Sequence, residues 1–339
     1  MHNNITIKIK NLSTGYKHKG HDIVVGNNLN AEIHEGEMIC MLGPNGAGKS
    51  TLLRTLAAFQ SPLAGEIKIM SRPLREYKPN QLSRLVSVVL TDNSSIKNMT
   101  ARDVVSIGRS PYTGFWGRLR EKDRKMVEKC LSWVGMTELA ERKMQTLSDG
   151  ERQKVMIAKA IAQETPVIFL DEPTAFLDYP SKVGMMLLLH RLAKTLKKSI
   201  FLSTHDLEHA LQVADKIWLI DQKRGLTTGI PEDLCADGLI GEYFKHDGLK
   251  FDPSTSTFHI QHETVRTVQV HSESPDYRAD LLCKALLRNA IRPVVPNEES
   301  RGTRIFIPSD GTYRIIHEGE EKHCVTKIEH AVKAIFEFL

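Results

Sequence analysis

Short, wholly apolar runs recur along the first two thirds of the chain, each followed at once by glycine or polar residues. They lie at residues 38–42, 167–170 and 200–202. Apolar runs of this length are typical of strands that are covered on both faces of a parallel sheet. Between them, apolar residues recur at helical spacing, as in the stretch that contains Val155 and Ala158. The alternation of strands and helices predicts an α/β fold.

The pattern changes after Asp247. A chain of 339 residues exceeds what one hydrophobic core usually supports, so we expect two domains, at residues 1–247 and 248–339. Residues 253–257 (Pro-Ser-Thr-Ser-Thr) suit a linker or a turn. The second domain is predicted to be a small α+β unit. Strand-like alternation occurs at residues 264–270, 304–307 and 313–316, and helix-like patterns occur at 277–290 and 325–339.

The composition is that of an ordinary globular protein, and no apolar run approaches the roughly 18 residues of a membrane-spanning helix. The first residues alternate Ile5, Ile7 and Ile9 with polar residues, which predicts a strand and not a secretion signal. A formal charge of +5 is mild for this length and does not indicate nucleic acid. We therefore expect a cytoplasmic protein whose role at a membrane is peripheral.

Five cysteines are scattered along the chain without a CxxC pair or a histidine at metal-ligand spacing. This distribution indicates neither a disulfide framework nor a zinc site. We expect all five to be small core residues. They are Cys40, Cys130, Cys235, Cys283 and Cys324.

The sharpest motif follows the apolar run at residues 38–42 and fits the pattern GxxxxGK[ST]. Glycines allow consecutive backbone N–H groups to face a phosphate, and a helix that opens at Lys49 points its positive end at the same place. By this logic Lys49 neutralises the β and γ phosphates of a nucleotide while the Ser50 hydroxyl ligates Mg²⁺. A glycine-rich structural turn into a helix is the alternative. The predicted phosphate loop comprises Gly43, Pro44, Asn45, Gly46, Ala47, Gly48, Lys49, Ser50 and Thr51.

Two carboxylates, Asp171 and Glu172, end the apolar run at 167–170 before Pro173 stops it. In open α/β sheets, ligands bind at the carboxyl ends of the strands. Asp171 is therefore placed to hold Mg²⁺, directly or through water, and Glu172 to orient or deprotonate an attacking water. The alternative is a solvated acidic turn. The phosphate loop by itself leaves kinases, GTPases and many ATPases open.

The segment Leu-Ser-Asp-Gly-Glu at residues 147–151 precedes a helix-spaced apolar stretch. Ser148 with Glu151 also forms the pattern of a capping box at a helix start, and the two interpretations are compatible. The segment resembles the signature of ABC ATPases, usually written LSGGQ, which no other phosphate-loop class carries in this place. The resemblance implies that Ser148, Asp149, Gly150 and Glu151 meet the γ phosphate of an ATP held by the opposite subunit.

Other marks of that family follow in its order. Asp178 resembles the aspartate of the D-loop, which crosses the dimer interface, and His205 resembles the switch histidine that bonds the γ phosphate. Tyr16 matches the aromatic residue that stacks on adenine, with internal packing as the alternative. The resemblance covers about residues 5–233. It implies a P-loop NTPase domain of ABC ATPase type, with an antiparallel β subdomain, a RecA-like core and a helical subdomain at about residues 91–163.

The sequence departs from the family where a glutamine normally follows the strand that leads into the helical subdomain. Thr91 occupies that position and Asp92 follows it. A threonine hydroxyl reaches less far than a glutamine, so we expect Asp92 or a bridging water to complete the contacts to metal and attacking water. An ATPase-dead regulatory module is a third interpretation, against which the intact Lys49, Asp171 and Glu172 argue.

Residues 100–112 resemble importer ATPases that serve iron–siderophore, haem and cobalamin uptake, in which Gly-Arg-x-Pro follows this helix. The resemblance implies a homodimer on the cytoplasmic face of the inner membrane that binds ATP and Mg²⁺. It also implies a transmembrane permease, whose coupling helix reaches this region, and indirectly a substrate-binding protein. We expect Tyr112, Phe115 and Trp116 to be partly exposed anchors for that helix, with packing inside the helical subdomain as the alternative.

The rival interpretation is a soluble ABC ATPase that acts on ribosomes or DNA. Such proteins usually carry two domains of this kind in one chain or a long coiled-coil insertion, and neither pattern occurs between Lys49 and Asp171 or after it. In the C-terminal domain, His259, His262 and His271 are dispersed and do not form a metal site. By analogy with other members, that domain is regulatory or stabilises the dimer. The favoured function is import energised by ATP hydrolysis, without a nucleic-acid partner.

Overall fold

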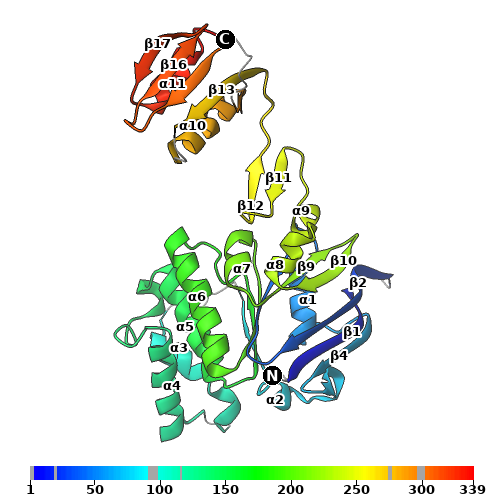
Figure 1. Ribbon diagram of the computed structural model, residues 1–339. Helices are drawn as coiled ribbons and strands as arrows, with labels where there is room; N and C mark the ends of the chain where they lie inside the picture. Colours follow the sequence, from blue (N-terminus) through cyan, green and yellow to red (C-terminus); the bar gives the residue numbers. More distant parts are fainter. Residues whose placement is uncertain (1–3, 19–20, 91–97, 115–116, 274–276, 296–301) are drawn as a thin grey trace. The chain divides into compact units, whose positions relative to one another are not determined.

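A computed structural model describes residues 4–18, 21–90, 98–114, 117–273, 277–295 and 302–339 (Figure 1). The chain forms two compact units. The first comprises Met1–Lys245 and Phe251–Thr257, and the second comprises His246–Lys250 and Phe258–Leu339.

A six-stranded sheet forms the centre of the first unit. Five neighbouring strands run parallel, and the edge strand β10 pairs antiparallel with β9. Strands β3 and β8 are buried along their whole length, as expected for strands covered on both faces. The strand order is β10 (Gly225–Gly229), β9 (Lys216–Asp221), β3 (Met38–Leu42), β8 (Ser199–Ser203), β7 (Val167–Asp171) and β6 (Val86–Val89).

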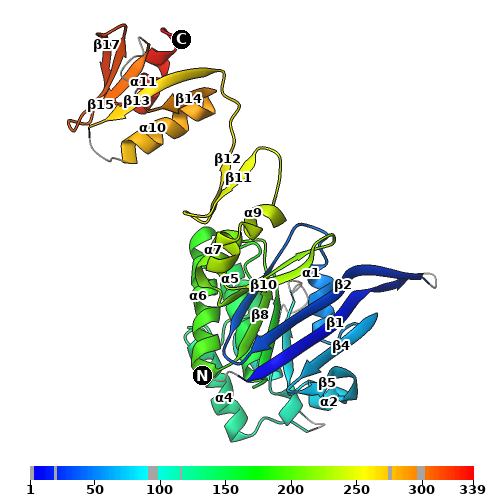
Figure 2. The same ribbon diagram turned by 45° about the vertical axis from the view of Figure 1, so that its right-hand side comes forward.

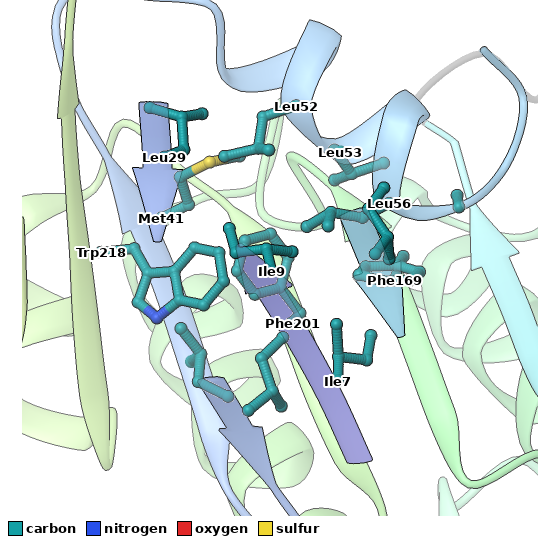
Figure 3. Packing of buried hydrophobic residues seen from close by; sticks show 14 of the residues in the cluster. Ile7, Ile9, Leu29, Met41, Leu52, Leu53, Leu56, Phe169, Phe201 and Trp218 are labelled. Carbon is teal, nitrogen blue, oxygen red and sulfur yellow. The ribbon is translucent and has the colours of Figure 1, made fainter. Parts of the chain in front are cut away.

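An antiparallel sheet packs against one face of this centre. Its order is β2 (His21–His34), β1 (Ile5–His18), β4 (Ala64–Ile69) and β5 (Arg72–Pro73). Ile7 and Ile9 of β1 share one core with α1 (Lys49–Leu56) and with aromatic residues of the parallel sheet (Figure 3). Within that core the ring of Phe201 meets those of Phe169 and Trp218 edge to face, at centroid distances of 5.7 and 4.9 Å. The core fixes the strand ends around which the site is built.

Part of the first unit is helical, and we call it the helical part. It contains α3 (Ala101–Ile107), η2 (Ser110–Tyr112), α4 (Glu121–Trp133), η3 (Met144–Thr146) and α5 (Asp149–Ala162). Helix α5 contacts both α3 and α4. Thr100 and Ser148 cap α3 and α5 with their side-chain oxygens, as residues of these types do at helix starts.

Further helices complete the first unit. They are η1 (Leu74–Glu76), α2 (Pro79–Leu82), α6 (Tyr179–Leu196), α7 (Leu207–Val213), α8 (Pro231–Ala236) and α9 (Leu239–Tyr243). Strands β11 (Leu249–Asp252) and β12 (Thr257–Ile260) form a hairpin, so the stretch expected to be a linker or turn is the turn of that hairpin. Among the helices formed by the described residues, none is both long and apolar enough to span a membrane.

The described residues of the second unit form a mixed five-stranded sheet with two helices (Figure 2). Its order is β14 (Ile291–Val294), β13 (Arg266–Ser272), β15 (Arg304–Ile307), β16 (Tyr313–His317) and β17 (Glu320–Val325). Helices α10 (Tyr277–Arg288) and α11 (Ile328–Ile335) contact each other and the sheet, and the three parts share one apolar core. Strands β14 and β17 were not expected from the sequence. The expected helix at 325–339 begins only at Ile328, because Val325 belongs to β17.

The expectation that all five cysteines lie in the core is wrong for two of them. Cys40, Cys130 and Cys235 are buried, but Cys283 is only partly buried and Cys324 is exposed. Cys324 lies on β17, where it pairs with Arg314 of β16. Burial raises the pKa of the Cys130 thiol to about 12, so this thiol stays protonated and inert.

Neighbouring leucines of α10 provide a test of the second core. Leu282 is fully buried, whereas Leu281 is 45% exposed. We expect Leu282→Ala to destabilise the second unit by about 2–5 kcal/mol, because it leaves a cavity, and Leu281→Ala to cost at most about 0.5 kcal/mol. Hydrogen exchange of the amides of α10 measures both values. Equal effects of the two substitutions would contradict this packing.

Candidate functional site

The loop between β3 and α1 requires glycine at two points. A Cβ atom at Gly43 would lie 2.2 Å from the carbonyl oxygen of Ile220, and one at Gly48 would lie 2.5 Å from Cγ1 of Val25. Gly48 also caps α1 in the left-handed conformation, with φ 97°. The result is a bare backbone loop at the start of a helix. Such a loop fits a phosphate group, because its amides and the helix dipole attract an anion.

Lys49 lies across this loop and is 7% exposed. Its Nζ atom donates to the carbonyl oxygens of Gly43 and Pro44, at 2.8 and 3.1 Å. Burial lowers the pKa of Lys49, and the charges of Glu172 and Asp171 oppose that effect. An ammonium group held over a phosphate-binding loop and balanced by two carboxylates is suited to a nucleotide's phosphates.

The remaining loop residues differ in exposure. Asn45, Gly46 and Ser50 are exposed, Thr51 is partly buried, and Ala47 is buried in the core that Figure 3 shows in part. The amide group of Gln222, which follows β9, donates to the carbonyl oxygen of Gly46 at 2.8 Å. Gln222 thus supports the loop from a neighbouring strand, and no sequence motif had singled it out.

Sheet pairing brings the expected metal ligand beside the loop. Ser203, the last residue of β8, pairs in register with Met41 of β3 on one side and with Asp171 of β7 on the other. Its hydroxyl donates to Oδ1 of Asp171 at 2.6 Å. Asp171 therefore lies at the sheet edge from which the phosphate loop leads to Ser50, so Asp171 and Ser50 are the two candidate ligands. A carboxylate and a hydroxyl oxygen are ligands that suit Mg²⁺, so these two residues fit the expected ion.

Glu172 is held in an unusual backbone conformation, with φ 47°. Its amide donates to the carbonyl oxygen of Ser203 at 3.2 Å and to the Ser203 hydroxyl at 3.0 Å. Its Oε1 atom lies 2.7 Å from Nε2 of His205. The carboxylate and the imidazole thus form a pair at the strand edge, where a water molecule and a terminal phosphate can be oriented.

The signature segment begins α5 with a complete capping box. The amide of Glu151 donates to Oγ of Ser148 at 3.3 Å, and the amide of Ser148 donates to the Glu151 carboxylate at 2.8 Å. Asp149 pairs with Arg152 in the same turn. Gly150 faces Leu177, since a Cβ atom at Gly150 would lie 3.8 Å from Cδ2 of that residue. The signature and the D-loop segment are therefore neighbours within one chain.

Asp178 lies at the start of a helix, and Tyr16 lies on a strand of the antiparallel sheet. Oδ1 of Asp178 accepts the amide of Ser181 at 3.1 Å and caps α6, and this bonding lowers the pKa of Asp178. Tyr16 is 51% exposed on β1 and pairs with Ile23 of β2, the strand whose Val25 approaches the phosphate loop. An exposed ring on this pair of strands is a suitable surface for a base.

The structure does not bring all predicted residues together. Within the parts of the chain that the structure describes, no hydrogen bond or ion pair joins the start of α5 to residues 43–51. Thr91 and Asp92 lie outside the described residues, as do Phe115 and Trp116. The role of Ser203, which binds both Asp171 and Glu172, was not foreseen. Its place in the run Ser-Thr-His-Asp, two residues before His205, is the signal that could have indicated it.

Comparison with known proteins gives consistent results. A family model described as "ABC transporter" matches residues 26–175. An uncharacterized ABC transporter ATP-binding protein of Methanocaldococcus jannaschii is 39% identical over 78% of this chain and 90% of its own length. The petrobactin import ATP-binding protein FpuD of Bacillus anthracis is 35% identical over 74% of this chain and 91% of its own.

A solved structure extends this comparison to the fold. The dimeric ATP-binding cassette MJ0796, in a post-hydrolysis state bound to ADP and Pi, is 28% identical and matches with a TM-score of 0.58. The match covers 66% of this chain and 98% of that one. The expected fold class, an α/β cassette of the P-loop type, is thereby confirmed.

Proposed function

We propose, because this chain belongs to the ABC transporter family of ATP-binding proteins, that two copies of it close on ATP and energise a separate membrane permease for import. The chain is an ATPase of this family. The proposed cargo class is an iron–siderophore, haem or cobalamin. The similarity to FpuD, a petrobactin import ATP-binding protein, supports this class, as does the Gly-Arg-x-Pro segment at residues 108–111. The protein would lie peripherally on the cytoplasmic face of the inner membrane.

The observation that carries the proposal is a site divided between two places. Lys49, Asp171 and Glu172 lie around one strand edge, whereas Ser148 begins a helix that makes no hydrogen bond with the phosphate loop among the described residues. A signature of this kind would complete the site of a second copy. The existence of a dimeric cassette among the similar structures supports this arrangement. We therefore propose that ATP is held between the loop of one protomer and the signature of its partner.

The proposed mechanism follows from the geometry at the strand edge. The loop amides and Lys49 bind the phosphates, and the exposed ring of Tyr16 stacks on the base. Mg²⁺, held by Ser50 and Asp171, would neutralise charge on the β and γ phosphates. Glu172 orients the attacking water and accepts its proton, while His205, 2.7 Å away, fixes the carboxylate and meets the γ phosphate. Binding closes the dimer and product release opens it.

A groove on the first unit, which we call the lateral groove, offers a binding place for the permease. It has a volume of about 790 Å³ and lies between the residues after α1, strand β4, the segment 73–83 and β6. Tyr77, Leu82 and Val88 line it, and Phe59, 60% exposed, stands at its side. A groove of this size, lined mainly by apolar residues, suits one end of an amphipathic helix. We propose that the coupling helix of the permease binds here.

Tyr112 is partly exposed, as expected of an anchor. Its ring also lies 4.2 Å from the Arg109 guanidinium carbon, and its hydroxyl donates to the carbonyl oxygen of Gln163 at 3.0 Å, which fits the alternative of packing. The side chain is thus engaged inside the helical part. Phe115 and Trp116 lie outside the described residues.

Phe59→Ala tests the lateral groove. We expect it to weaken binding to the permease by about tenfold or more, because an exposed aromatic anchor is removed. The free energy of unfolding of the chain without ATP should stay the same. Leu187→Ala on α6, with Leu187 54% exposed, is the matched control. Affinity is measured by titrating the detergent-solubilised permease with the purified protein. Equal affinity of Phe59→Ala and Leu187→Ala would remove the groove from the interface.

Transport itself tests the proposed function. Proteoliposomes with the permease and this chain should take up cargo only with internal ATP, and competing ferric siderophore, haem and cobalamin should identify the class. Uptake that does not depend on this chain would contradict the proposal. The rival function, on ribosomes or DNA, predicts instead that the chain fails to bind any neighbouring membrane protein.

A further inference from the structure

Helix α5 connects two places that matter to the proposed function. It begins at Asp149, next to the signature residue Ser148, and ends at Ala162. Fourteen residues of α-helix span about 21 Å. The residue that caps its far end, Gln163, lines the lateral groove. A displacement of one end of a rigid helix moves the other.

Gln163 fastens the end of α5 to the wall of the groove. Its Nε2 atom donates to the carbonyl oxygens of Ser83 and Val86, at 2.6 and 3.0 Å. Both acceptors belong to the segment that lines the groove. An element that enters the groove must therefore press on this side chain or on the backbone that it holds.

Arg109 locks the same end of α5 to the rest of the helical part. It is 3% exposed, and its guanidinium donates to the carbonyl oxygen of Ala162 at 2.7 Å, to Glu164 at 2.5 Å and to the buried Asp123 at 2.9 Å. The Tyr112 ring covers the guanidinium, and its hydroxyl binds the Gln163 backbone. A buried guanidinium with these partners has one low-energy position, so the parts that it joins move together.

A close backbone approach supports the same lock. A Cβ atom at Gly108 would lie 2.2 Å from the carbonyl oxygen of Lys159, in the last turn of α5. The end of α3 is therefore in direct contact with the end of α5. There is no room for one to slide on the other without disturbing the Arg109 contacts.

We propose that Arg109, Tyr112 and Gln163 are positioning residues that couple the lateral groove to the signature. An occupant of the groove displaces Gln163, the locked end of α5 follows, and the helix carries the displacement to Ser148. The proposal rests on the proposed function only for the identity of the occupant, the permease helix. None of the three residues belongs to the proposed nucleotide or metal site. They act by setting where the start of α5 lies.

A chemical label in the groove replaces the permease in the test. Ser83→Cys is placed in a Cys283→Ser, Cys324→Ser background, where the other cysteines are buried, and is modified with a bulky maleimide. Hydrogen exchange is followed at the amides of Glu151 and Arg152, which bond to Ser148 at the start of α5. The control label is placed on Ser132→Cys, an exposed position of α4.

The groove label should change these exchange rates by about fivefold or more, the lower end of coupling between distinct sites. The control label should not change them. In Gln163→Ala and Tyr112→Phe proteins, which keep the buried ion cluster, the effect should fall below about twofold. A structural role alone would leave the label's effect unchanged in these variants. That outcome, or the absence of an effect in the parent, would overturn the proposal.

ATP hydrolysis by the unlabelled chain, measured with the permease present, separates this inference from the proposed function. Coupled exchange in a chain that does not hydrolyse ATP would support the positioning role and refute the proposed function. Hydrolysis in a chain whose exchange ignores the label would do the reverse. Circular dichroism of each variant confirms that it is folded.

Discussion

Glu172→Gln is expected to lower kcat for ATP hydrolysis by about 10²–10⁴-fold. The substitution keeps the size of the side chain and its hydrogen bond to His205, whose Nε2 lies 2.7 Å from the carboxylate. It removes the group that would accept a proton from the attacking water. ATP binding should remain, because the phosphates are held by the loop and by Lys49. A steady-state phosphate-release assay with the permease present measures the loss.

The same variant should form an ATP-dependent dimer that persists, since the nucleotide is bound but not consumed. Sedimentation with and without ATP and Mg²⁺ detects it. Glu208→Gln, an exposed glutamate in the first turn of α7, is the matched control and should behave as the parent. Parental turnover in Glu172→Gln would show that another group activates the water. A monomer under all conditions would argue against a site shared between two copies.

Arg109→Ala is expected to destabilise the first unit by about 3–5 kcal/mol. The side chain of Asp123 is fully buried, and Arg109 donates to it from both Nε and Nη2. Once the guanidinium is removed, the amide of Arg120 is the one hydrogen-bond donor to that carboxylate among the described residues. The loss of one partner in a buried ion pair costs more than the pair contributes, because the other charge stays out of water.

Arg102→Ala provides the control for that measurement. Arg102 also pairs with two carboxylates, those of Glu128 and Glu141, but all three side chains are well exposed. Exposed ion pairs contribute about 0–1 kcal/mol, so we expect a small effect. Urea unfolding, followed through tryptophan fluorescence, gives both free energies, since the described tryptophans lie in the first unit. A cost of under about 1 kcal/mol for Arg109→Ala would show that the cluster relaxes or takes up water.

The buried strands and the glycine turn between β3 and α1 could be predicted from the sequence, because both depend on local chemistry. A run such as residues 38–42 has no polar face to expose, and Gly43 and Gly48 stand where a side chain would strike Ile220 or Val25. Strands β14 and β17 were missed because β14 is short and β17 is mostly polar. Both are stabilised by pairing with strands that lie elsewhere in the sequence.

Two further features have the same origin. The sequence gives no sign of which way the Tyr112 ring turns, and contact with Arg109 and Gln163, far along the chain, decides it. Likewise, Ser203 bonds to the Asp171 carboxylate and to the Glu172 amide only because the register of β8 places it between β3 and β7. Long-range pairing of this kind cannot be read from residue type and spacing alone.

The backbone conformation of Glu172 lowers the stability of the fold, while its side chain is required for the proposed activity. A left-handed conformation costs a residue such as glutamate about 1–2 kcal/mol, and the two bonds from its amide to Ser203 hold it there. Glycine and asparagine adopt this conformation more readily, but neither offers a carboxylate within reach of the same place. Variants selected for thermal stability alone would therefore accumulate glycine or asparagine at position 172, and this trade-off would yield sturdier proteins that bind ATP and do not turn it over.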